Sequence, residues 1–118
     1  MSDKDNAKIL EARYREYAEA YGIASQKGDS RATNRNHDKL VALVPKLRAF
    51  GDQGESILRR LMMDQSDAVA AWAATHSLPF AEADALGVLD VLGKKHGVTA
   101  LDATMTARLW RAGALKIR

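Results

Sequence analysis

The sequence predicts an all-α fold in which about six helices pack as antiparallel pairs. Apolar residues recur every three or four positions along almost the whole 118-residue chain, and no stretch alternates with a period of two. Single glycines stand where these helical patterns end, and the connections are a few residues long. The length fits one domain, 1–118, in which we expect residues 1–4 and the tail 114–118 to be loosely ordered.

The first predicted helix covers residues 5–26. Its apolar stripe consists of Leu10, Tyr14, Tyr17, Tyr21 and Ala24. Glu11, Arg15 and Glu19 alternate in sign four residues apart, which favours an exposed face. Gly28 follows at the position where a left-handed residue commonly ends a helix.

The second helix begins at Ser30 or Asn34, both of which can cap a helix, and ends before Gly51. Its apolar stripe consists of Leu40, Leu43, Val44, Leu47 and Phe50. Pro45 lies inside this stripe, where it removes one backbone hydrogen bond. We favour a kink near Val41 over a separate helix that starts at Pro45, because the same face stays apolar on both sides of the proline.

The third helix is short and covers residues 54–63. Its buried set is Ile57, Leu58, Leu61 and Met62. A polar turn over residues 64–67 follows, in which Ser66 caps a fourth helix over residues 67–77. One face of the fourth helix carries Val69, Trp72, Ala73 and His76. Most of its other positions are alanine, and a helix that is apolar nearly all round is predicted to be buried.

Pro79 fits the first turn of a fifth helix over residues 80–95. Its inward residues are Ala85, Leu86, Val88, Leu89 and Leu92. A sixth helix covers residues 99–112 and ends at Gly113. Its predicted buried stripe is Leu101, Met105, Leu109 and Ala112. Three pairs over this length give about 39 residues a pair, close to known helical-repeat periods.

The segment 61–78, LMMDQSDAVAAWAATHSL, resembles a HEAT repeat in its leucine helix, its aspartate-containing turn and its alanine-rich second helix. Ala70 stands where such repeats usually carry an arginine that meets the turn of a neighbouring unit. A polar ladder along a long stack is therefore not expected, and a closed unit of three pairs fits better.

The chain from residue 7 to residue 115 also resembles a small bacterial family of unknown function with an armadillo-type α-α superhelix. The resemblance is carried by Asn34-Arg35 ahead of Leu40, by Ala73-Ala74 and by the ending LWRAGAL. It implies an armadillo/HEAT-like α-α superhelix of three helix pairs and supplies no catalytic residues. An irregular helical bundle is the alternative architecture.

Charge is distributed unevenly around a net value of +3. Residues 31–50 carry a net +4, residues 51–90 carry −5 and residues 91–118 carry +5. Two basic blocks that flank an acidic one can mark an acidic partner or nucleic acid. Ordinary solvated helix faces with a local sign imbalance are the simpler interpretation.

Several classes of chemistry have no support in the sequence. Cysteine is absent, no histidine pair has metal-ligand spacing, and no glycine loop could cradle a phosphate, so we expect no metal site and no cofactor. His76 lies on an apolar face and is predicted to be a core histidine. A general base at His37 with Asp38 beside it is the third functional alternative.

The sequence best fits a protein-interaction module that docks an unidentified protein partner on a concave helical face and has no catalysis of its own. The candidate partner-binding residues are Arg35, Lys39, Arg108, Trp110 and Arg111. A homodimer is a variant of this hypothesis. Nucleic-acid binding through the two basic blocks is the alternative. The polar start and the short apolar runs lead us to expect a cytoplasmic protein without a membrane span.

Overall fold

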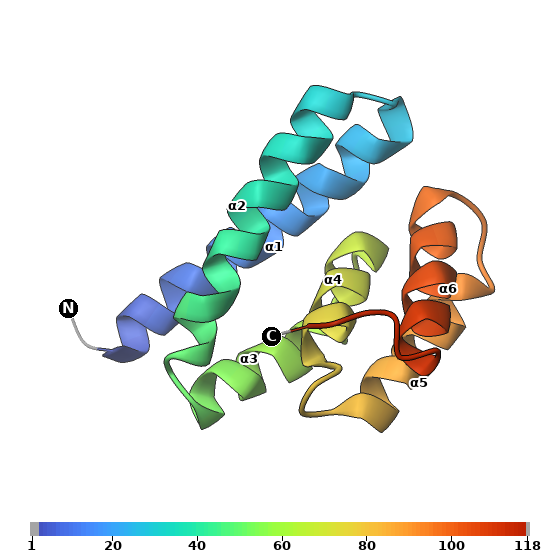
Figure 1. Ribbon diagram of the computed structural model, residues 1–118. Coiled ribbons are helices and arrows are strands. Elements are labelled where there is room, and N and C mark those ends of the chain that lie inside the picture. Colours follow the sequence, from blue (N-terminus) through green and yellow to red (C-terminus); the bar gives the residue numbers. More distant parts are fainter. Residues whose placement is uncertain (1–2, 118) are drawn as a thin grey trace. The chain divides into compact units, whose positions relative to one another are not determined.

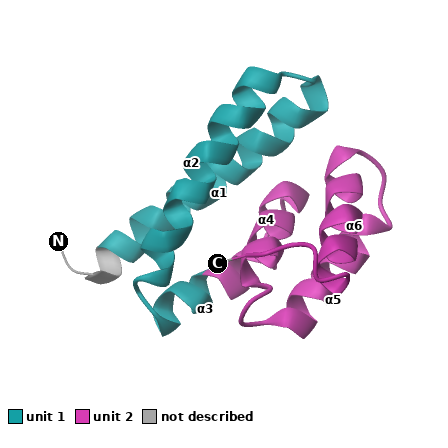
Figure 2. Ribbon diagram, in the orientation of Figure 1, with its two compact units in different colours: residues 1–57 teal, residues 58–118 magenta. Residues whose placement is uncertain are grey.

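Figure 1 shows the computed structural model of the protein, which describes residues 3–117 and the side chains of residues 6–117. Within these residues the chain forms six α-helices and no strand, which confirms the predicted all-α class. It divides into two compact units, residues 1–57 and 58–118 (Figure 2). The single domain stays a prediction. Among the described helices, none combines the length and apolar character that crossing a bilayer requires.

In the first unit, α1 (Asp3–Lys27) and α2 (Ser30–Arg48) lie side by side and run antiparallel (Figure 1). The core between them contains Ala7, Tyr14, Ala18, Ala24, Leu40, Leu43, Val44 and Leu47. Tyr14 is completely buried, and this burial raises the pKa of its hydroxyl well above the ordinary value. The predicted stripe of α2 is buried except for Phe50, which lies beyond the end of the helix. In the predicted stripe of α1, Tyr14 and Ala24 are buried, whereas Leu10, Tyr17 and Tyr21 are half-buried.

Gly28 and Asp29 join the two helices. Gly28 has φ +72°, the left-handed conformation predicted for it. The cap is Asp29 rather than Ser30 or Asn34, because Asp29 has the extended backbone and its Oδ1 accepts a hydrogen bond from the Ala32 N–H at 3.1 Å. Aspartate, serine and asparagine cap helices about equally well, so the sequence alone could not show which of these neighbouring residues is the cap.

The end of α2 packs closely against the next helix, α3 (Asp52–Leu61), which begins and ends two residues earlier than predicted. α2 continues without a break through Pro45, so the alternative of a separate helix is wrong. Gly54, predicted to be the first residue of α3, lies inside it and is buried. A Cβ atom at position 54 would overlap the carbonyl oxygen of Leu47, so this approach requires glycine.

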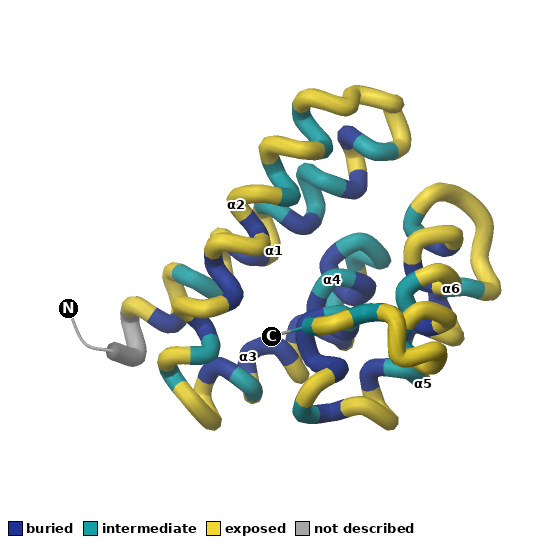
Figure 3. The backbone as a smooth tube through the Cα atoms, in the orientation of Figure 1, coloured by how far each residue is buried: buried dark blue, intermediate teal, exposed yellow. Residues whose placement is uncertain are grey.

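In the second unit, α4 (Asp67–Ser77) has the predicted bounds and the predicted cap, with the Ser66 hydroxyl accepting from the Val69 N–H at 3.4 Å. Every residue of α4 is buried or half-buried (Figure 3), as its apolar character predicted. His76 is buried and its ring stacks on Trp72 with centroids 5.4 Å apart. α4 packs chiefly against α5 and also contacts α6.

α5 (Glu82–Gly93) is shorter than predicted at both ends. Pro79 is not in its first turn, because the N–H of Ala81 still bonds to the carbonyl of Ser77 and the chain leaves α4 through a turn. Of the predicted inward residues, Ala85, Leu89 and Leu92 are buried, whereas Leu86 and Val88 are half-buried.

α6 (Val98–Arg111) turns a different face inward than predicted. The buried residues are Ala100, Ala103 and Ala107. The residues predicted to be buried are exposed instead, with exposed fractions of 72% for Leu101, 49% for Met105 and 36% for Leu109. Ala112 is exposed as well.

The close approach of α5 and α6 explains this orientation. A Cβ at Gly93 of α5 would stand 2.5 Å from the hydroxyl oxygen of Thr104 in α6, and that hydroxyl lies 3.5 Å from the Gly93 carbonyl. Leucine or methionine facing α5 would hold the two helices apart, whereas alanine lets them approach. A periodic pattern identifies an apolar face but does not choose between two apolar faces of one helix.

Candidate partner-binding grooves

A groove within the second unit runs between α5 and the segment that joins α3 to α4. Its volume is about 710 Å³. Its buried apolar lining consists of Met62, Ala70 and Leu92. Its more exposed apolar lining consists of Met63, Ala83, Gly87, Val88 and Val91. We call this feature the α3–α5 groove.

Two side chains of the α3–α5 groove are unusually open to water. Met63 is 82% exposed and Val91 is 60% exposed. Apolar surface left in water forgoes about 25 cal/mol for each Å² that could be buried. Methionine is flexible and adapts to the shape of what it contacts, which makes it common on binding surfaces.

Gly87 gives the α5 wall of the groove a flat centre. It lies in the middle of a helix, where glycine costs about 0.5–1 kcal/mol relative to alanine. Unlike Gly54 and Gly93, it has no close neighbour among the described residues, because a Cβ at this position would meet nothing within 4 Å. Internal packing therefore does not account for this glycine, and the bare backbone faces open space.

The end of the groove near the start of α5 carries an ion pair. The Arg59 guanidinium lies 3.5 Å from the Asp84 carboxylate, and both side chains are largely exposed. Arg59 also lies over the Phe80 ring, 5.5 Å from its centroid. This end is close to neutral in charge.

The other end of the groove, near the end of α5, is more acidic. Asp67 accepts two hydrogen bonds from the Lys95 ammonium at 3.0 and 3.1 Å, and Asp64 accepts one from the Ser66 N–H at 2.8 Å. Among the residues that line the groove, three carboxylates stand against one guanidinium, from Arg59. The groove is thus apolar along its length and acidic at one end.

A second groove, between α5 and α6, has a volume of about 770 Å³ and a more basic lining. Its charged lining residues are Asp90, Lys94, Arg108 and Arg111. Arg111 donates two parallel hydrogen bonds to the Asp90 carboxylate at 2.9 and 2.7 Å. These bonds, and the nearby positive charges of Arg111 and Lys94, lower the pKa of the Asp90 carboxyl.

Replacing Arg111 with glutamine is expected to raise the pKa of Asp90 toward its ordinary value, because the charge-assisted hydrogen bonds are lost. A carboxyl whose pKa is lowered by folding contributes stability above its unfolded pKa of about 3.9 and loses it as the pH falls through the folded value. The variant should therefore lose less stability than the wild type as the pH falls below about 4.

Titration of the Asp90 carboxyl carbon by NMR measures this shift directly. Arg108→Gln is the matched control, because Arg108 lines the same groove and has no part in the shift of Asp90. An Asp90 pKa that is the same in Arg111→Gln and in the wild type would contradict the pairing.

The structure brings Arg108 and Arg111 into one groove but places Trp110 elsewhere. The Trp110 indole N–H donates a hydrogen bond to the Glu82 carboxylate at 3.1 Å, and Trp110 lines neither groove. This bond fastens the end of α6 to the start of α5. Arg108 and Arg111 thus share a groove whose lining does not include Trp110.

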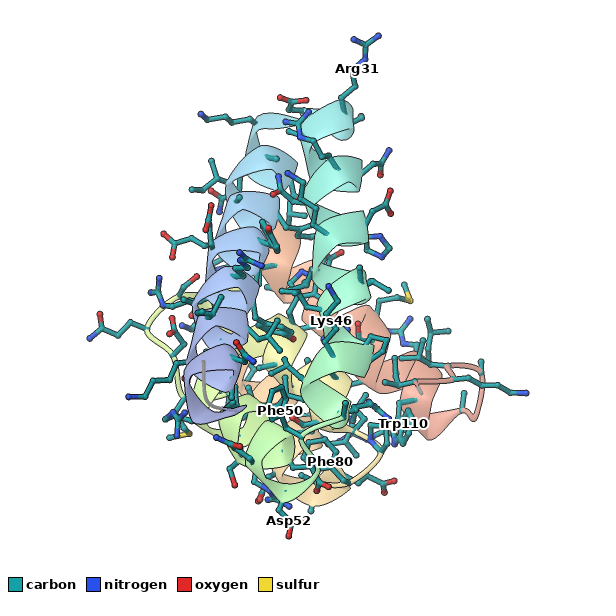
Figure 4. The ribbon with its side chains drawn as sticks, turned by 90° about the vertical axis from the view of Figure 1, so that its left-hand side faces the viewer. Arg31, Lys46, Phe50, Asp52, Phe80 and Trp110 are labelled. Atoms are coloured by element: carbon teal, nitrogen blue, oxygen red, sulfur yellow. The ribbon has the colours of Figure 1, made fainter. Side chains whose placement is uncertain are left out.

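The other predicted site residues, Arg35 and Lys39, are exposed on α2 in the first unit, one turn apart. The Lys39 ammonium lies over the Tyr17 ring, 5.6 Å from its centroid. Arg31 at the start of α2 extends away from the helix pair, and Lys46 lies several turns further along (Figure 4). The basic residues of α2 are thus spread along the helix.

The His37 and Asp38 side chains are both exposed on α2, with His37 Nδ1 3.2 Å from Asp38 Oδ1. Neither residue lines either groove. A general base acts on a substrate held within hydrogen-bond reach, and the two grooves do not supply such a position at His37. Across the part of the chain that the structure describes, no three metal-ligating side chains come together.

Comparison with protein-family models, curated proteins and solved structures finds no match to this chain. The resemblance drawn from the sequence thus stays a prediction.

Sequence analysis did not single out Met63, Gly87 or Val91. The predicted third helix assigned Met62 to the core, correctly, and left its neighbour without a role. One signal could have found the groove, namely a glycine inside the predicted helix 80–95 at a distance from both ends. Whether such a glycine makes room for the chain itself or for another molecule depends on tertiary packing.

Proposed function

We propose that the protein is a protein-interaction module without catalysis of its own, which binds an amphipathic helix of a partner in the α3–α5 groove. The observation that supports this most directly is the exposure of Met63 and Val91 on either side of an apolar groove. Apolar side chains gathered on a concave surface and bordered by charge are typical of protein-binding sites.

The dimensions of the groove suit a helix. Ala83, Gly87 and Val91 are spaced four residues apart on α5 and cover about 12 Å along its axis. Ala83 and Gly87 are small enough to allow a second helix to approach within about 8–10 Å between the axes. A helix that presents apolar residues three or four positions apart would cover Met63 and Val91 together.

Charge favours a partner helix with a basic residue at one end. The lining of the groove has three carboxylates, against which stand Arg59 and, bonded to Asp67 from outside the lining, Lys95. A basic side chain beside the docked apolar row would meet this small excess of negative charge. Such contacts set the register and orientation of the docked helix more than they raise affinity.

The finer architecture is part of the same proposal. An armadillo/HEAT-like superhelix is supported by the antiparallel pair of α1 and α2 and by the packing of α5 on α6. It receives less support from α4, which packs chiefly against α5 rather than forming the predicted pair with α3. The concave docking face expected from the sequence stays a prediction, and the groove is the surface that we propose.

The alternative, nucleic-acid binding, has less support. The Arg111 guanidinium is engaged by Asp90, and the Trp110 indole is bonded to Glu82. Arg108 and Lys94 remain in the α5–α6 groove, but a nucleic-acid site would need more uncompensated charge and an available ring for stacking.

The proposal predicts that the protein selects amphipathic helices from a displayed library of peptides roughly 20 residues long. Selected peptides should carry an apolar row with a basic residue toward one end. Gly87→Leu, whose Cβ would meet nothing within 4 Å, and Met63→Asp should each weaken binding by about tenfold or more. Binding is measured by fluorescence anisotropy of labelled peptides.

Val41→Asp is the matched control, because Val41 is an exposed apolar residue in the first unit, 42% open to water. It should leave peptide binding unchanged. Selected peptides that bind Gly87→Leu and Met63→Asp as tightly as the wild type would show that the groove is not the binding site. A library from which no helix is enriched would also contradict the proposal.

A further inference from the structure

The outer face of α6 is itself an apolar row of the kind that the groove would bind. It consists of Val98, Leu101, Met105 and Leu109, spaced by three, four and four residues. Their exposed fractions are 37, 72, 49 and 36%. We call this row the α6 stripe. α6 is thus apolar on two faces, of which only the alanine face is used by the core.

We propose that the α3–α5 groove of one molecule binds the α6 stripe of a second copy, so that the chain associates head to tail. This inference rests on the proposed function, because it names the helix that the groove takes. It also accounts for two exposed apolar surfaces on one small unit, since each would cover the other in the next molecule.

The two surfaces match in length and relief. Leu101, Met105 and Leu109 form a ridge with a spacing of four residues and a length of about 12 Å. The row of Ala83, Gly87 and Val91 on α5 has the same spacing and length. Met105 over Gly87 would place a large side chain of one helix against the smallest residue of the other, as a ridge in a groove.

Charged residues also border the α6 stripe. Asp102 and Arg108 lie three residues before and after Met105, on opposite flanks of the stripe, about 9 Å apart along the helix axis.

A symmetric pairing of two α6 stripes is less favourable. In an antiparallel pair centred on Met105, the two Asp102 carboxylates lie on the same flank and the two Arg108 guanidinium groups lie on the other. Each flank would then gather like charges, which the head-to-tail contact avoids. The net charges of residues 51–90, which are −5, and of residues 91–118, which are +5, favour the same choice.

The groove and the stripe lie on different helices, so the contact is heterologous and does not close on itself in a pair. Two variants block the two surfaces of this contact one at a time. Gly87→Leu blocks the groove and leaves the stripe, whereas Leu101→Asp with Met105→Asp blocks the stripe and leaves the groove. All three substituted positions are exposed, and circular dichroism checks that each variant keeps its helices.

Sedimentation equilibrium provides the test. The wild type is expected to show an average mass that rises with concentration, up to about 1 mM, above the 12.9 kDa of one chain. Each blocked variant alone should remain a monomer. An equimolar mixture of the two should form a heterodimer of about twice the chain mass and nothing larger, because only one productive contact remains. Val41→Asp should associate like the wild type.

Cross-linking gives a second measurement that does not depend on blocking either surface. The chain has no cysteine, so Gly87→Cys and Met105→Cys can be introduced into separate molecules. A disulfide should form between these two variants when mixed and oxidised, because their Cβ atoms would face each other across the contact. A mixture of Val41→Cys with Met105→Cys is the control and should give only background coupling.

Three results would overturn the inference. In the first, the wild type remains a monomer at every concentration. In the second, the two blocked variants fail to form a heterodimer when mixed. In the third, association persists with the groove blocked and vanishes with the stripe blocked, which indicates symmetric α6 pairing. The peptide library separates these failures from that of the proposed function. If selected helices bind the groove while the second copy does not, the proposed function stands and the self-association falls.

Discussion

Replacing Gly54 with alanine is expected to lower the free energy of unfolding by about 1–3 kcal/mol or more. The added methyl group would overlap the backbone carbonyl oxygen of Leu47. A backbone group at the end of α2 cannot rotate away as a side chain can, so α3 must move out of place. Urea unfolding followed by circular dichroism measures the change.

Gly87→Ala is the matched control, because Gly87 is also a helix-interior glycine but has open space where the methyl group would go. This substitution should raise the free energy of unfolding by about 0.5–1 kcal/mol, since alanine restricts the unfolded chain and favours the helix. Equal effects of the two substitutions, in either direction, would contradict the packing of α3 against α2.

Leu89→Ala is expected to lower the free energy of unfolding by about 2–5 kcal/mol, because Leu89 is completely buried in α5 and its loss leaves a cavity. The same substitution at Leu101 should change stability by less than about 0.5 kcal/mol, since that side chain is 72% exposed. The sequence alone predicted that both leucines are buried. A large loss of stability in Leu101→Ala would restore that interpretation and contradict the inward alanine face of α6.

The small loss of stability expected for Leu101→Ala bears directly on function. Leucine and methionine at three exposed positions of one helix contribute little to the core of their own unit, so folding does not explain their presence there. In the proposed head-to-tail contact, another molecule covers them. The same reasoning applies to Gly87, which weakens its own helix and opens the surface that a partner helix would occupy.

The sequence predicted much of the secondary structure because its signals are local. Ser66 caps α4 as predicted, since the preference of serine for this position depends only on nearby backbone groups. The predicted ends of α5 were wrong because Pro79 is compatible both with a first helical turn and with the turn that follows α4. The local sequence is compatible with both conformations. The chain adopts the turn, in which the Ala81 N–H donates a hydrogen bond to the Ser77 carbonyl.

The candidate site was predicted only in part. Arg108 and Arg111 do share a groove, but the sequence could not foresee that Asp90, 21 residues earlier, would engage one of them. The α3–α5 groove escaped notice because its lining comes from three helices, and exposed apolar residues such as Met63 look the same in a sequence as buried ones. Contacts between distant residues decide which apolar side chains remain in water.

The amino-acid sequence by itself determined that this protein is helical, where its helices lie to within a few residues, and which residues are apolar. Each of these follows from interactions within a few residues along the chain. Only the tertiary structure decided which of the two apolar faces of α6 enters the core. The alanine face is buried because Gly93 and Thr104 bring α5 and α6 close together, and the larger side chains therefore remain exposed.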